Sequence, residues 1–247
     1  MELNEVASGM PGLPSSSLSF EIDRLLEDAR LVRSEGRYVD AKDILEGALT
    51  LCSSTRTPTL KARVQHALGW VLWTMGRVDD SIRHLRESRA AFRVAGHMKD
   101  EALALSALGY VFHEMGKSYT AKPMFLESIE LLVESGNPVD ARQVLGKLAN
   151  LERAIGELDE SLQHFDESIA LQEQVGDVMN SIGNRIDRSR TLIRMERFEE
   201  AESAIMEIIA MCKQRKSPMY EAFALDSLGD LYLTQGRNED AVGALRV

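Results

Sequence analysis

Side chains suited to molecular recognition recur along the chain at spacings of three, four and seven residues, which place them on one face of a helix. Arginine can bind a carboxylate through paired hydrogen bonds, and tryptophan and tyrosine supply the large rigid contacts that dominate many protein interfaces. This combination suits an extended ligand with carboxylates and apolar anchors. The candidate binding residues are Arg30, Arg33, Arg63, His66, Trp70, Trp73, Tyr110, His113, Asn150, Arg153, Arg190 and Arg194.

Signatures of catalysis and metal binding are absent from the sequence. It contains no glycine-rich phosphate or dinucleotide motif, no His-Glu-x-x-His and no Cys-x-x-Cys. His66 and His113 could approach one another on adjacent helices, but two imidazoles outside any metal-binding motif make a weak metal site, so a polar groove or surface role is favoured. We therefore expect no catalytic residue, no metal, no cofactor and no enzymatic activity.

The charge and the apolar pattern exclude other classes of partner. The 247 residues carry 39 acidic and 29 basic side chains, a net charge of -10, which disfavours binding to nucleic acid or anionic lipid. No apolar run approaches the roughly 20 residues that cross a bilayer, and the N-terminus lacks the pattern of a signal peptide. Cys52 and Cys212 lie far apart and are interpreted as reduced thiols. We expect a cytoplasmic protein that contacts neither nucleic acid nor membrane.

A period of forty residues organises the chain that carries these side chains. Glycine makes up about 7% of average sequence, so its recurrence in five of six members of one column is not a chance event. Glycine at such a position ends a helix in the left-handed conformation and turns the chain into the next helix. This column contains Gly36, Gly76, Gly116, Gly156, Glu196 and Gly236, and a second one between repeats contains Gly96, Gly136 and Gly176. Each period is therefore predicted to be a helical hairpin.

Two further columns contain only small residues. They stand seven positions before and five positions after the first glycine column, where the two helices of a hairpin would cross. We expect these residues to let the helix backbones approach closely. The members are Ala29, Gly69, Gly109, Ala149, Ser189 and Gly229 on the first helix, and Ala41, Ser81, Ala121, Ser161, Ala201 and Ala241 on the second.

The segments LGWVLWTMGRVDDSIRHLRES (68–88), LGYVFHEMGKSYTAKPMFLES (108–128) and LGDLYLTQGRNEDAVGAL (228–245) resemble tetratricopeptide repeats (TPR). The long period is similar to that of bacterial MalT-like and Rap-like regulators, kinesin light chain and Pins-type scaffolds. The resemblance implies an all-α protein, a right-handed α-solenoid of about six helical hairpins whose first helices line a concave, partner-binding surface. The expected organisation is a flexible leader at 1–19 and a solenoid at 20–247, with repeats at about 20–56, 57–96, 97–136, 137–176, 177–216 and, incomplete, 217–247.

The fifth repeat departs from the pattern, because Arg188 stands where four of the other repeats have leucine and Glu196 stands at the turn, whereas the first repeat has Asp28 in the leucine column. Two interpretations of its four arginines remain open. They pair with acids of the preceding helix such as Asp166 and Glu167, or they form an anion-binding patch with Asn150 and Arg153. The Lys-and-Asn carboxylate clamp of some tetratricopeptide domains is not carried over, because the expected lysine is replaced by Gly146 or Ile186. The four arginines are Arg185, Arg188, Arg190 and Arg194.

These observations predict a non-enzymatic module that binds a protein or peptide, with acidic or carboxylate groups, on its concave face. We expect it to be the sensing or scaffolding region of a larger regulatory protein that continues beyond Val247. For Trp70, Trp73 and Tyr110, a role in the groove and a role in the seam between helices are both open. The alternative function is a structural solenoid that self-associates through its ends.

Overall fold

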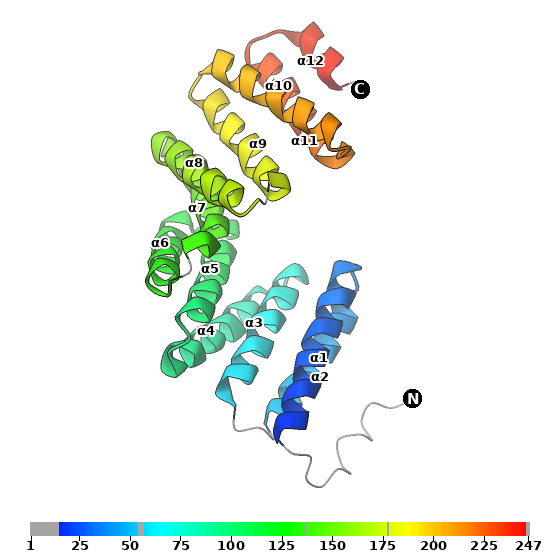
Figure 1. Ribbon diagram of the computed structural model, residues 1–247, viewed down its shortest axis with the longest axis vertical. Coiled ribbons are helices and arrows are strands. Elements are labelled where there is room, and N and C mark those ends of the chain that lie inside the picture. Colours follow the sequence, from blue (N-terminus) through cyan, green and yellow to red (C-terminus); the bar gives the residue numbers. More distant parts are fainter. Residues whose placement is uncertain (1–14, 54–56, 137, 177, 246–247) are drawn as a thin grey trace. The chain divides into compact units, whose positions relative to one another are not determined.

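The computed structural model describes residues 15–53, 57–136, 138–176 and 178–245, and these residues form helices joined by short turns (Figure 1). Within these ranges there are twelve α-helices, one 3₁₀ helix and no strand, so the predicted all-α fold of paired helices is confirmed. The chain divides into two compact units, unit 1 up to Glu114 and unit 2 from Met115. No helix in the described ranges is long and apolar enough to span a membrane.

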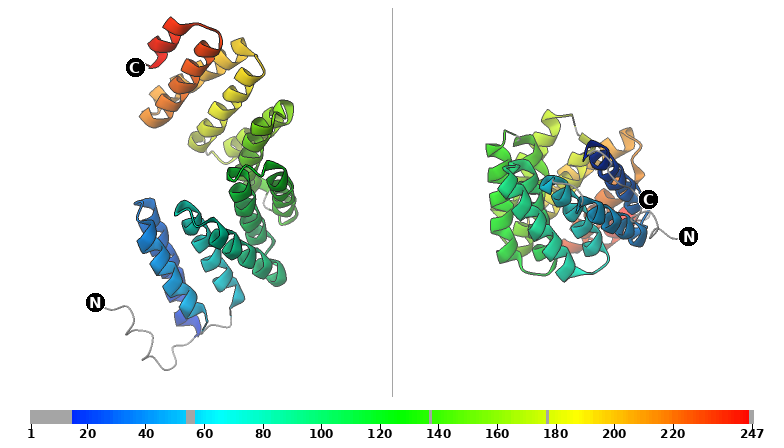
Figure 2. Two further views of the ribbon diagram at one scale, coloured as in Figure 1. Left: turned by 180° about the vertical axis from the view of Figure 1, so that it is seen from behind. Right: turned by 90° about the horizontal axis from the view of Figure 1, so that it is seen from below.

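Unit 1 contains five α-helices in its described part. Each packs on the next along the chain, and the alternate helices α1, α3 and α5 also contact one another in sequence (Figure 2). α1 begins inside the stretch that was expected to be a leader, and the rest of that leader lies outside the described residues. The bounds are α1 Ser15–Ser34, α2 Tyr38–Cys52, α3 Pro58–Thr74, α4 Val78–Ala95 and α5 Met98–Glu114.

Unit 2 contains the remaining helices and repeats this pattern. Neighbours along the chain pack on one another, and α7 contacts α9 as α9 contacts α11. Proline at the first helical position opens α11 as it opens α3, where its fixed backbone angle favours helix initiation. The bounds are α6 Ser118–Glu134, η2 Pro138–Asp140, α7 Ala141–Ile155, α8 Leu158–Gln174, α9 Val178–Arg194, α10 Phe198–Gln214, α11 Pro218–Thr234 and α12 Asn238–Leu245.

The turns between helices confirm the role predicted for the two glycine columns. Every glycine of both columns has a positive φ, for example +90° at Gly156, which ends α7. Glu196 adopts the same left-handed conformation with φ of +59°, and so does Lys216 with φ of +54°. The fold therefore keeps its turn geometry at these two positions although a side chain makes that conformation unfavourable.

The crossing of α3 and α4 shows why the small-residue columns are needed. A Cβ atom added to Gly69 would lie 2.6 Å from Cγ of Leu85, a residue with no exposed surface. At the same crossing, the hydroxyl of Ser81 donates a hydrogen bond of 2.7 Å to the carbonyl oxygen of Gly69. The predicted close approach of the two columns is confirmed for this pair.

Candidate functional site

The predicted binding residues lie on the first helix of each hairpin, and we name two surfaces accordingly. The α1–α3–α5 face belongs to unit 1 and the α7–α9–α11 face belongs to unit 2. The first carries Arg30, Arg33, Arg63, His66, Trp70, Trp73, Tyr110 and His113, and the second carries Asn150, Arg153, Arg190 and Arg194.

A pocket of about 440 Å³ opens on the α1–α3–α5 face. α1 and α3 form its walls and Leu45 of α2 contributes from beneath, where it is buried. Four of the predicted residues, two from each wall, come together here. The lining consists of Leu26, Ala29, Arg30, Arg33, Leu45, His66, Ala67, Trp70 and Val71. The apolar residues among them provide an apolar interior, and the two arginines add positive charge.

The basic residues of unit 1 differ in their partners. Arg30 donates hydrogen bonds of 2.9 and 2.6 Å to the carboxylate of Glu27 on its own helix. Arg63 lies outside the pocket lining and pairs with Asp23 across α1 and α3 at 2.6 Å. The guanidinium of Arg33 makes no hydrogen bond or ion pair with any residue that the structure describes, and it is exposed. Arg33 is therefore the cation of the pocket that is available to a ligand.

Three aromatic residues continue the face from the pocket towards α5. The ring centroids of Trp70 and Tyr110 are 5.4 Å apart, and those of Trp73 and Tyr110 are 6.3 Å apart with the rings nearly perpendicular. All three side chains are half-buried. They therefore fill the seam between α3 and α5 and still present part of their surface to solvent, so both interpretations of their role apply. Half-buried His113 lies beside them on α5.

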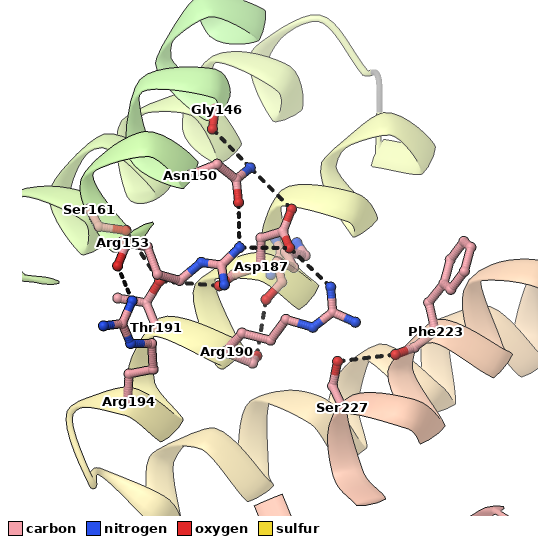
Figure 3. Close-up of polar contacts among 12 residues, drawn as sticks. Gly146, Asn150, Arg153, Ser161, Asp187, Arg190, Thr191, Arg194, Phe223 and Ser227 are labelled. Atoms are coloured by element: carbon pink, nitrogen blue, oxygen red, sulfur yellow. Dashed lines mark hydrogen bonds and ion pairs between the residues drawn. The ribbon is translucent and has the colours of Figure 1, made fainter. Parts of the chain in front are cut away.

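On the α7–α9–α11 face, Asn150, Arg153 and Arg190 lie around a carboxylate of the same chain, Asp187 of α9 (Figure 3). Arg190 donates to Oδ1 of Asp187 at 3.2 Å, and Asn150 donates to Oδ2 at 3.3 Å. A terminal nitrogen of Arg153 lies 3.6 Å from Oδ1 of Asp187. Arg190 also pairs with Asp226 of α11 at 3.3 Å. An internal anion therefore occupies the place where the sequence predicted a ligand carboxylate.

Arg153 is the most enclosed cation of this cluster. It donates a hydrogen bond of 2.6 Å to Oδ1 of Asn150, and its backbone carbonyl accepts a hydrogen bond from Arg194. Burial lowers the pKa of Arg153, the neighbouring charges of Arg190 and Arg194 lower it further, and Asp187 opposes this shift. Asp187 therefore stabilises the charged form of a partly desolvated guanidinium.

The other arginines of the fifth repeat follow the first of the two open interpretations. Arg188 donates to Asp166 of the preceding helix at 2.6 Å, and Arg185 pairs with Glu173 of the same helix. The second interpretation, an anion-binding patch with Asn150 and Arg153, stays a prediction, and in this structure Asp187 pairs with both Arg153 and Arg190. The sequence pattern contains no signal for Asp187. The equivalent positions of the other repeats hold residues of different types, namely Glu27, Ala67, Ala107, Lys147 and Ser227.

The seam between α7 and α9 explains two further differences from the predicted face. Gly146 packs closely on α9, since a Cβ atom there would lie 2.8 Å from Oδ1 of Asn184, so a longer side chain would require the amide of Asn184 to move. Ile186 and Ile193, placed by helical spacing on the same face as Arg190, are buried in the core of unit 2. In α7 and α9, the earlier residue of the predicted face, Gly146 or Ile186, is therefore buried. The residue four positions later, Asn150 or Arg190, is half-buried.

No group of three or more histidine, cysteine, aspartate or glutamate side chains in the described part of the chain could hold a metal ion. The two faces present charged groups, hydrogen-bonding groups and apolar surface.

Comparison with known proteins identifies similar repeats in two parts of the chain. Family models described as tetratricopeptide repeat match residues 29–93 and 142–175. A curated relative, the regulatory protein RapG of Bacillus subtilis (strain 168), is 23% identical over 155 residues, which cover 60% of this chain and 42% of RapG. The chain thus aligns with less than half of that relative.

Solved structures show the same fold at low sequence identity. The Rap conjugation gene regulator of plasmid pLS20, in complex with the Phr* peptide, matches with a TM-score of 0.69 and 16% identity, over 97% of this chain and 76% of that one. A protein of Podosopora anserina, described as a kinesin light chain with nearly identical TPR-like repeats, matches with a TM-score of 0.65 and 16% identity, over 81% of this chain and 99% of that one. Two stretches of the chain therefore match tetratricopeptide repeats, and its paired helices have the fold of the tetratricopeptide-repeat structures to which it is similar.

Proposed function

We propose that this chain is a protein- or peptide-binding tetratricopeptide module without catalytic activity, which forms the sensing or scaffolding region of a larger regulatory protein. Two features of its relatives support this function. RapG is a regulatory protein, and the pLS20 Rap regulator was solved with the Phr* peptide bound. The chain covers only 42% of RapG, so a role within a longer regulator is compatible with its length.

The observation that carries the proposal is the pocket on the α1–α3–α5 face and its continuation by Trp70, Trp73 and Tyr110. Half-exposed aromatic side chains beside an apolar pocket are typical of the anchor points of protein interfaces. The same surface presents arginines and no metal-binding or catalytic group, which favours recognition over chemistry.

Selection from a displayed library of random octapeptides, followed by calorimetric titration of the enriched peptides, tests this function. We expect Trp73→Ala to weaken binding by about tenfold or more, because aromatic anchors dominate interface energies. The matched control is Tyr119→Ala, which removes an aromatic residue that is 81% exposed on α6, outside both faces. Melting curves confirm that both variants fold. Equal binding by wild type and Trp73→Ala, or no enriched peptide at all, would overturn the proposal.

A second candidate is self-association, which the exposed apolar residues of the first and last described helices favour. Phe20 of α1 is 72% exposed, and Val242 and Leu245 of α12 are 46% and 57% exposed. Sedimentation velocity across a hundredfold range of concentration distinguishes the two candidates. A mass that stays that of a monomer while peptide binding persists eliminates self-association as the function.

A further inference from the structure

We infer that the pocket between α1 and α3 binds a peptide segment in which a large apolar residue stands beside an acidic residue, with the apolar side chain inside the pocket and the carboxylate on Arg33. This inference rests on the proposed function and assigns the type of ligand and the residues that select it.

The size and lining of the pocket determine the apolar part of the ligand. Its volume of about 440 Å³ falls within the ~300–1,000 Å³ of typical ligand pockets. This volume is sufficient for a leucine or phenylalanine side chain and part of the neighbouring peptide backbone. Leu45 and Val71 are buried, while Ala67 is half-buried and leaves space beside His66 and Trp70. An apolar side chain that enters removes apolar surface from water on both partners.

The charges of the pocket determine the polar part of the ligand. Glu27 already binds Arg30 through two hydrogen bonds, so the net charge of Arg30, Arg33 and Glu27 is +1, and Arg33 carries the charge that no described side chain balances. A carboxylate can accept two hydrogen bonds from the planar guanidinium of Arg33. A basic or neutral segment gains no such contact.

The surroundings of the pocket favour a peptide over a free small acid. Trp70 forms part of the pocket lining and also contacts Tyr110 of α5, which contacts Trp73 in turn. The pocket therefore continues into a half-exposed aromatic surface on which residues flanking the anchor can lie. A free carboxylic acid would use the pocket alone.

The two tryptophans of the chain provide a local readout. Trp70 lines the pocket and Trp73 does not, so in the Trp73→Phe variant all tryptophan fluorescence comes from the pocket, and an aromatic ring still packs near Tyr110. The probes are octapeptides enriched on the wild-type chain from a random displayed library, each resynthesised with the acidic residue replaced by glutamine or the apolar residue replaced by serine, and the Trp73→Phe variant serves only for the fluorescence titrations. A further arm titrates free 4-methylvalerate.

We expect the enriched peptides to contain the apolar–acidic pair, to shift the emission of Trp70, and to lose about tenfold in affinity with either replacement. Arg33→Gln should abolish the preference for the acidic peptide over its glutamine form. Arg24→Gln, which removes the same charge from the opposite side of α1, should leave that preference unchanged. Ala67→Phe, which fills the pocket, should abolish the emission shift.

The outcomes separate this inference from the proposed function. Peptides that bind without the apolar–acidic pair, or equally well to Arg33→Gln and Ala67→Phe, would overturn the inference and leave the peptide-binding function standing. Saturable binding of 4-methylvalerate without any peptide that shifts the emission of Trp70 would also overturn it. A failure of every peptide to bind any surface of the chain would overturn both.

Discussion

The Nδ1 atom of His164 lies 2.7 Å from Oε2 of Glu152, a carboxylate whose side chain is 1% exposed. The other oxygen of Glu152 lies 3.2 Å from Nζ of Lys122. A buried carboxylate is tolerated only with such partners, and this one joins α6, α7 and α8. The rest of its forty-residue column is apolar or aromatic, with Val32, Leu72, Phe112, Leu192 and Tyr232.

This contact makes the stability of unit 2 depend on pH. The hydrogen bond to Glu152 raises the pKa of His164 above 6.5, although burial acts in the opposite direction. The protonated form of His164 is therefore favoured in the folded state. The free energy that this contact adds to the folded state is fully present below about pH 6, and it is lost as the pH rises through the higher folded-state pKa of His164. We expect His164→Gln to reduce the free energy of unfolding most at about pH 5.5 and less at about pH 8.5, as measured by urea denaturation. His97→Gln, a change at an exposed histidine, is the control; a loss that increases with pH would contradict this origin.

The crossing of α3 and α4 predicts a large difference between two glycine substitutions. Gly69→Ala forces a methyl group against buried Leu85, and such overpacking costs about 1–3 kcal/mol. Gly47→Ala is the matched control, because that exposed glycine of α2 has no atom within 4 Å of an added Cβ and alanine favours the helix by up to about 1 kcal/mol. Thermal and chemical denaturation measure both effects. Equal stability of the two variants would show that α3 and α4 can move apart without cost.

The turn at Glu196 should be improved by glycine. Its φ of +59° costs a residue with a side chain about 1 kcal/mol or more relative to glycine. We expect Glu196→Gly to raise the free energy of unfolding by about 1 kcal/mol and Gly156→Ala, at a φ of +90°, to lower it by a similar amount. Denaturation curves compare the pair. A destabilised Glu196→Gly variant would mean that the glutamate side chain makes a compensating contact.

The carboxylate of Asp187 should contribute strongly to the stability of unit 2. Asp187→Asn leaves Arg153 without its nearest carboxylate and next to two like charges, so we expect a loss of about 1–3 kcal/mol. The control is Asp230→Asn, because that exposed side chain makes no ion pair with any residue in the described ranges. If both variants unfold at the same urea concentration, the cluster in Figure 3 adds nothing to stability.

Most of the fold could be predicted from the sequence because its determinants repeat. A glycine column every forty residues marks each turn, and the contact of Ser81 with Gly69 follows from two small-residue columns that share this period. The meeting of α1 and α3 residues at the pocket could also be anticipated in part, since His66 and Trp70 share a helical face. These residues enclose a pocket together with Leu45 of α2. The contribution of Leu45 depends on how the helices pack, which the spacing of residues along the sequence does not determine.

The arrangement around Asp187 could not be predicted, because two of its three partners, Asn150 and Arg153, are 37 and 34 residues away in the sequence and follow no motif, and only Arg190 is close to it on the same helix. Helical spacing also placed Ile186 and Ile193 on the exposed face, whereas α9 is covered on several sides by α7, α8, α10 and α11. The rotation of 100° per residue shows which side chains of a helix share a face. It does not show which face stays exposed to solvent when several helices pack around it.

The close backbone contact at Gly69 and Ser81 has a consequence for how such a protein diversifies. The distance between α3 and α4 depends on residues that leave little room for variation, whereas the predicted binding residues His66, Trp70 and Trp73 of α3 take no part in that contact. Changes in the recognition residues can therefore accumulate without altering the geometry of the frame. The predicted binding residues of α3 and the residues that fix this crossing stand at different positions, so substitutions at the former leave the spacing of α3 and α4 unchanged.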